Sequence, residues 1–150
     1  MAAILARAAV TATVSSTIPV INNIFYLVTT VKTLTSSQDM KDIIDDLDIE
    51  ATVSTVEMVC NQHTTGPPEF LLAREYVEKG LTAVKFDLET IHVITRLHRE
   101  GWISRWRTLK LTKEKRKLAR SMQILRSRFN MMWSIAHGLT TRNDPSALPK

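Results

Sequence analysis

Residues 112–138 read TKEKRKLARSMQILRSRFNMMWSIAHG, and this stretch decides the fold class. Its large apolar residues recur at intervals of four, three, four, three and four, which places them on one face of an α-helix. Thr112 is suited to be the N-cap of that helix, and Gly138 is suited to follow its last residue. The apolar face comprises Leu118, Met122, Leu125, Phe129, Met132 and Ala136. We therefore predict a helix over residues 112–138 whose leucines and Phe129 face a core.

The same periodicity predicts a second long helix over residues 69–99. Its apolar residues recur at intervals of four, three, four and three, which again favours one buried face. Pro67 or Pro68 can begin this helix, and Gly101 ends it. The face predicted to be buried comprises Val77, Leu81, Val84, Leu88 and Ile91.

Two earlier helices complete the pattern. One is predicted over residues 38–62, where two adjacent apolar stripes follow the helical period. The first stripe comprises Ile44, Leu47, Ala51 and Met58, and the second comprises Ile49, Val53, Val56 and Cys60. The other segment, residues 1–34, forms one helix or two, because Pro19 lacks a backbone donor and clashes with the preceding turn.

The composition agrees with an all-α fold. Only four Gly and five Pro occur in 150 residues, which is less turn chemistry than a β-rich fold needs. The single cysteine excludes an intrachain disulfide and favours a cytosolic or nuclear compartment. We predict an antiparallel four-helix bundle over residues 1–138, with a short connector helix over residues 102–111 before the last helix. Residues 139–150 are expected to form a linker or tail toward something longer.

No residue pattern in the chain is typical of an enzyme. The four histidines show no HExxH arrangement, no CxxC accompanies them, and no glycine-rich phosphate loop is present. The aspartates from Asp42 to Asp48 lack the Gly and the distant Glu of a calcium loop. Cys60 lies on an apolar stripe, which favours a packed thiol over a catalytic one. We expect no catalytic residue, no cofactor and no metal.

Charge is distributed very unevenly along the chain. Residues 8–31 hold no charged side chain, whereas residues 96–128 hold twelve Lys or Arg against two Glu, a formal charge of +10. The whole chain carries only +5, because the segment between them supplies acid, most densely over residues 39–50. An apolar head and a cationic second half indicate an anionic partner, either a bilayer or a nucleic acid. The alternative is a solvated helix face.

The uncharged segment of residues 8–31 admits several interpretations. It is long enough to cross a bilayer, which takes about 20 residues, but its Thr, Ser and Asn residues dilute its apolar character. It is too poor in Arg for a mitochondrial presequence, and its apolar part is too long for a signal peptide. A helix buried in the bundle is the simplest interpretation.

The basic segment also carries Trp102 and Trp106, and tryptophan favours membrane interfaces. The stretch ITRLHREGWISRWRTLKLTKEKRKLARSMQILRSRF, residues 94–129, resembles the end of HeLo-like domains, a family that includes the N-terminal bundle of the mixed lineage kinase domain-like pseudokinase. The shared pattern is a third helix, an aromatic connector, a Lys-rich cap and a last helix with an apolar stripe. Lys113, Lys115 and Lys117 match the cap.

The resemblance implies a cell-death effector that oligomerises, moves from the cytoplasm to a membrane on activation and permeabilises it. Residues expected to insert into the membrane are Ile4, Leu5, Val10, Val14 and Ile18. Residues expected to bind anionic lipid are Arg105, Arg107, Lys110, Lys113, Lys115, Arg116 and Lys117. Two other classes stay open: a basic helical protein that binds nucleic acid or resembles a viral matrix protein, and an adaptor bundle that does not lyse membranes.

Overall fold

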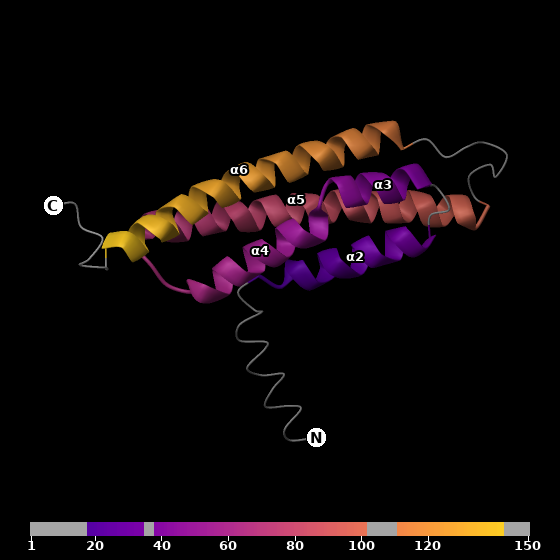
Figure 1. Cartoon of the computed structure of the whole chain (residues 1–150). Coiled ribbons are helices and arrows are strands. Elements are labelled where there is room, and N and C mark those ends of the chain that lie inside the picture. Colours follow the sequence, from indigo (N-terminus) through magenta and orange to yellow (C-terminus); the bar gives the residue numbers. More distant parts are fainter. Residues whose placement is uncertain (1–17, 35–37, 102–110, 143–150) are drawn as a thin grey trace, which may run out of the picture.

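The protein is helical throughout its described part. The computed structural model describes residues 18–34, 38–101 and 111–142, without the side chains of residues 38, 39 and 139–142 (Figure 1). Of these residues 89% are helical, and none of them lies in a strand. The helices are α2 (Val20–Leu34), α3 (Gln38–Asp46), α4 (Ile49–Gln62), α5 (Pro68–Arg99) and α6 (Thr112–Arg142), and they pack together. The prediction of an all-helical fold is confirmed.

Helices α5 and α6 lie side by side along the length of the molecule (Figure 1). They are in close contact at Gly80, where an added Cβ would lie 3.3 Å from Cδ1 and 3.5 Å from Cα of Leu125. Further along α5, the Asp87 carboxylate accepts a hydrogen bond from the Ser121 hydroxyl. Residue numbers therefore rise along α5 as they fall along α6, so these two helices are antiparallel. Glycine at position 80 weakens an isolated helix by ~1 kcal/mol relative to alanine, but here its missing side chain leaves room for Leu125.

The core contains the apolar faces predicted for these two helices. All five predicted residues of α5 are buried, and so are the predicted residues of α6 apart from Phe129, which is partly buried against the core. Those buried residues are Val77, Leu81, Val84, Leu88 and Ile91 on α5, and Leu118, Met122, Leu125, Met132 and Ala136 on α6.

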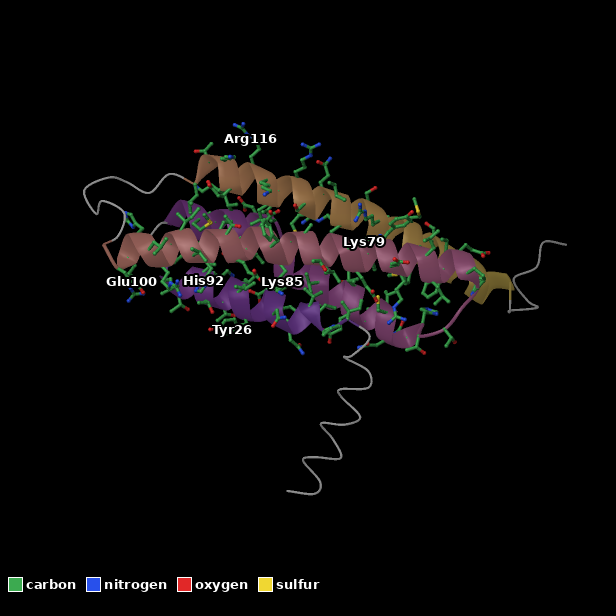
Figure 2. All side chains as sticks on the ribbon, turned by 180° about the vertical axis from the view of Figure 1, so that it is seen from behind. Tyr26, Lys79, Lys85, His92, Glu100 and Arg116 are labelled. Atoms are coloured by element: carbon green, nitrogen blue, oxygen red, sulfur yellow. The ribbon has the colours of Figure 1, made fainter. Side chains whose placement is uncertain are left out.

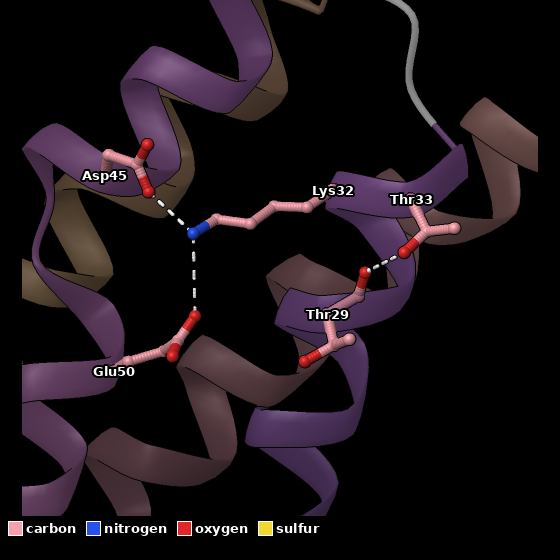
Figure 3. A network of polar contacts seen from close by, with 5 residues as sticks. All are labelled: Thr29, Lys32, Thr33, Asp45 and Glu50. Carbon is pink, nitrogen blue, oxygen red and sulfur yellow. Dashed lines mark hydrogen bonds and ion pairs between the residues drawn. The ribbon is translucent and has the colours of Figure 1, made fainter.

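The helix predicted over residues 38–62 is interrupted, which corrects the sequence-based boundary. Asp48, between α3 and α4, has φ 54° and ψ 41°, a left-handed conformation that ends one helix and redirects the next. Two long cations from other helices bind at this turn. Arg126 of α6 donates to the Leu47 carbonyl, and Lys32 of α2 lies 2.6 Å from Asp45 Oδ1 and 3.5 Å from Glu50 Oε1 (Figure 3). The hydrogen bond with Asp45 raises the pKa of Lys32.

This turn also decides which apolar stripe of the segment is buried. Of the two predicted stripes, the one that continues along α4 is buried at all four positions: Ile49, Val53, Val56 and Cys60. On the other stripe Ile44 is buried and Leu47 partly buried, but Ala51 and Met58 are exposed. The redirected helix presents only one of its two stripes to the core.

Helix α2 begins directly after Pro19, so the described part of the first predicted helix is residues 20–34. Its buried residues are Ile21, Ile24, Leu27, Val28 and Val31, and it packs mainly against α5. Residues 1–17 lie outside the described residues. The second half of the uncharged segment is therefore part of the core.

Of the predicted ends of the last two helices, one is confirmed and one is wrong. Helix α5 ends at Arg99, and Gly101 follows with φ 83°, which confirms the predicted stop. Helix α6 continues past Gly138 to Arg142, so the predicted end is wrong, as is the predicted start of the tail at residue 139. An interior glycine costs a helix only ~1 kcal/mol, and the next proline is Pro145. Of the predicted connector helix, residues 102–110 lie outside the described residues, and Leu111 is buried and not helical.

Candidate anion-binding face on helix α6

The first two turns of α6 hold the described part of the predicted lipid-binding set. Arg105, Arg107 and Lys110 lie outside the described residues. The remaining four are on α6, where Lys113, Arg116 and Lys117 are exposed and Lys115 is partly buried. The helix thus brings four of the seven predicted cations to one end of the described structure.

Three cations form a row on the outer side of α6. Lys113, Arg116 and Arg120, here called the basic row, are spaced three and four residues apart and are all exposed. That spacing places them on one helical face, opposite the face that buries Leu118 and Met122. Figure 2 shows Arg116 pointing away from the bundle. None of the ion pairs between described residues involves the basic row.

Arg120 was missing from the predicted set. Its spacing of four residues from Arg116 is the sequence signal that could have identified it.

Lys117 lies to one side of the basic row and has intramolecular partners. Its Nζ is 3.8 Å from Asp87 Oδ1 and 5.2 Å from the centre of the Phe86 ring. Asp87 is only 4% exposed, and its other oxygen accepts the hydrogen bond from Ser121. Lys117 therefore compensates a buried carboxylate, which the basic row does not do.

The basic row begins where the helix itself disfavours positive charge. The first turn of a helix carries a partial positive charge, so a cation there, such as Lys113, is destabilising by a few tenths of a kcal/mol. Glu114 is the single acidic residue in the first turn of α6. Lys113 thus opposes the helix dipole, and no residue of the basic row forms an ion pair with a described residue.

The outer side of α6 becomes apolar after Arg120. Ile124 and Met131 are both exposed, at 41% and 60%. Their positions, four and eleven residues after Arg120, continue the outer side of the helix. The exposed surface of α6 is therefore cationic toward its N-terminus and partly apolar toward its C-terminus.

No known protein family, curated protein or solved structure matches the chain. The resemblance to HeLo-like domains therefore rests on the residue pattern of the chain alone.

The predicted membrane-inserting residues are mostly outside the described structure. Ile4, Leu5, Val10 and Val14 lie outside the described residues, whereas Ile18 is 5% exposed and belongs to the core. Among residues 18–34, 38–101 and 111–142, no helix combines the length and the apolar character that a membrane span requires. In this structure Ile18 is a core residue.

Metal-binding and nucleophilic chemistry has little support within the described ranges. No group of three or more His, Cys, Asp or Glu there could hold a metal ion. Cys60 is fully buried, and its Sγ lies 4.0 Å from Sδ of Met132. Burial raises the pKa of the thiol to about 11. A packed thiol is what the sequence predicts at this position.

We expect Cys60 to react with a thiol reagent only when the protein unfolds. A pKa near 11 leaves about a hundredfold less thiolate at pH 8 than the ordinary value of 9.0 would, and burial blocks access. The measurement is the labelling rate at pH 8 in buffer and in concentrated urea, with Tyr26→Cys as an exposed control. Equal rates for Cys60 in the two solvents would contradict its burial.

Proposed function

We propose that the chain is a membrane-active domain that binds anionic lipid through the basic row of α6 and its neighbours. The observation that carries this proposal is a row of exposed cations with no ion pair to a described residue, which begins at the helix end where the helix dipole opposes positive charge. Each Lys or Arg close to an anionic leaflet contributes on the order of 1 kcal/mol. Three such residues on one face, with Lys117 beside them, can therefore hold a folded domain on such a surface.

The exposed apolar residues on the same helix favour lipid over nucleic acid. A membrane interface accepts cations at the headgroups and apolar side chains at the acyl boundary. Ile124, four residues after Arg120, would lie close to such a boundary once the basic row contacts the headgroups. The phosphates of a nucleic acid also bind cations, through counterion release. Apolar side chains beside those cations would not strengthen that binding.

The fuller proposal follows the HeLo-like resemblance. The chain would be an antiparallel four-helix bundle whose four helical segments are α2, the α3–α4 pair, α5 and α6. As the N-terminal part of a larger immune or signalling protein, it would rest in the cytoplasm and self-associate on a membrane after activation. Residues 1–17 would then enter the bilayer and permeabilise it, while the basic row holds the domain on the surface.

Reversing two charges of the basic row is expected to abolish surface binding. For Arg116→Glu with Arg120→Glu we expect roughly a thousandfold weaker binding to vesicles that contain phosphatidylserine. Two attractive contributions of ~1 kcal/mol are lost, and two repulsive ones replace them. Binding is measured by co-sedimentation at two salt concentrations, and circular dichroism checks that the helical signal is unchanged.

The matched control makes the same charge change on α5. Lys79→Glu with Lys85→Glu lowers the net charge equally, so an effect of net charge alone would weaken both variants alike. Binding that is equally tight to neutral vesicles, or insensitive to salt, would contradict the electrostatic account. Salt-dependent binding to RNA or DNA without lipid binding would favour the nucleic-acid class instead.

A further inference from the structure

An apolar groove lies between α5 and α6, beyond the basic row toward the C-terminus of α6. It is lined by Ala73 and Tyr76 of α5 and by Arg128 and Met131 of α6, and its volume is about 230 Å³. Met131 is 60% exposed, and Leu72 beside the groove is also exposed. We call these lining residues the outer groove. Exposed apolar residues that gather in a hollow are typical of an interaction surface.

The rim of the outer groove is cationic and held in place. Arg128 donates to the Tyr76 carbonyl at 3.1 Å, and its guanidinium lies 5.9 Å from the centre of the Tyr76 ring. Lys79 approaches the same ring at 5.7 Å. A tyrosine between two cations is a fixed contact surface, so the groove fits an apolar ridge whose edges carry acid.

Helix α4 presents a ridge of that kind. Ala51, Ser54 and Met58 are exposed and are spaced three and four residues apart, so they share one face. Met58 is 53% exposed, and Glu57 and Glu50, which also contacts Lys32, lie along one edge of the face. We call the face formed by Ala51, Ser54 and Met58 the acidic ridge, after the acidic segment that carries it. Residues 38–62 hold seven Asp or Glu against one Lys, a formal charge of −6. Helix α6, with eight Lys or Arg against one Glu, carries +7.

We propose that the acidic ridge of one copy of the chain binds in the outer groove of another copy, an inference that takes self-association from the proposed function. Figure 1 shows α3 and α4 in front of α5, whereas in Figure 2, seen from behind, α5 lies in front and carries the labelled Lys79. Ridge and groove therefore lie on opposite sides of the molecule.

Such a contact joins two different surfaces of the same chain. It leaves one ridge and one groove free in each pair, so further copies can add in the same direction and form a ring or a stack. The small side chains of Ala51 and Ser54 allow α4 to come close to the groove, and Met58 can contact Met131. Concentration of the chain on a membrane raises the effective concentration and favours the contact. The basic row lies outside it and stays available to lipid.

Cysteine pairing between two variants tests this arrangement. Met58→Cys and Met131→Cys are each prepared in the full chain, mixed in equal amounts and oxidised, both at high concentration in solution and on anionic vesicles. We expect the mixed disulfide to exceed either homodimer at least tenfold, because a disulfide forms only when the Cβ atoms come within about 4.5 Å. The native Cys60 is buried and does not compete. Tyr26→Cys, exposed on α2 and outside both surfaces, is the matched control and should pair with neither variant.

The other outcomes overturn the inference. A Met131→Cys homodimer as the main product would show a groove-to-groove contact, and a 1:2:1 mixture would show random collisions. Absence of any disulfide would show that the two surfaces do not meet. The result can be separated from a test of the proposed function. If the mixed disulfide forms in solution but the chain does not bind lipid, only the membrane proposal is contradicted. If the chain binds lipid but the mixed disulfide does not form, only the inference about ridge and groove is contradicted.

Discussion

Replacing Leu125 by alanine is expected to lower the free energy of unfolding by about 2–5 kcal/mol, the range for a buried leucine. Leu125 is fully buried and packs directly on Gly80 of α5. The small glycine leaves few neighbouring atoms that could move into the space left by the leucine. We therefore expect the upper half of that range, measured by urea denaturation monitored with circular dichroism.

Phe129→Ala is the informative comparison. In the sequence Phe129 belongs to the same apolar stripe as Leu125. If its ring were fully buried, Phe129→Ala would lower the free energy of unfolding by about 3–5 kcal/mol. The structure leaves Phe129 partly buried at the edge of the core. We expect about half that cost, in proportion to the apolar area buried. Ile124→Ala, at an exposed position of the same helix, serves as the control with little change. A larger loss for Phe129→Ala than for Leu125→Ala would contradict the packing described above.

A charge near the N-terminus is expected to remove membrane permeabilisation while surface binding persists. For Val10→Asp we expect at least a tenfold slower release of dye from anionic vesicles, because Asp near the centre of a bilayer costs about 2.5–3.5 kcal/mol. The same loss is expected for a charge at Ile4 or Leu5 and for deletion of residues 1–17. Binding should persist, since the basic row is on α6.

Two controls within the uncharged segment separate insertion from misfolding. Tyr26 is 67% exposed on α2, so Tyr26→Asp adds the same charge without disturbing the core or residues 1–17. Ile18 is buried, and Ile18→Asp should destabilise the fold, visible as a lower denaturation midpoint. If the chain without residues 1–17 released dye at the rate of the full chain, the proposal that this segment attacks the membrane would lose its main support.

The candidate site was only partly predictable from the sequence. The excess of positive charge in residues 96–128 is a property of composition, and the sequence alone located it. Which of these cations face outward depends on neighbours that are distant along the chain. Lys117 contacts Asp87, Arg126 contacts the Leu47 carbonyl and Arg128 contacts the Tyr76 carbonyl, so three cations that look alike in the sequence have partners within the fold. Each of those partners lies 30 or more residues earlier, and no local spacing reveals it.

The sequence by itself determined the helices and most of their buried faces. Hydrogen bonds within a helix join residues four apart, and the side chains on one face recur with the same short period, so both are local properties that spacing records. The stripes of α5 and α6 and the stop at Gly101 follow from them. The tertiary structure alone decided the turn at Asp48, where cations from α2 and α6 bind the ends of two helices. It also decided the tight contact between Gly80 and Leu125, because that contact depends on packing between helices that are distant in sequence.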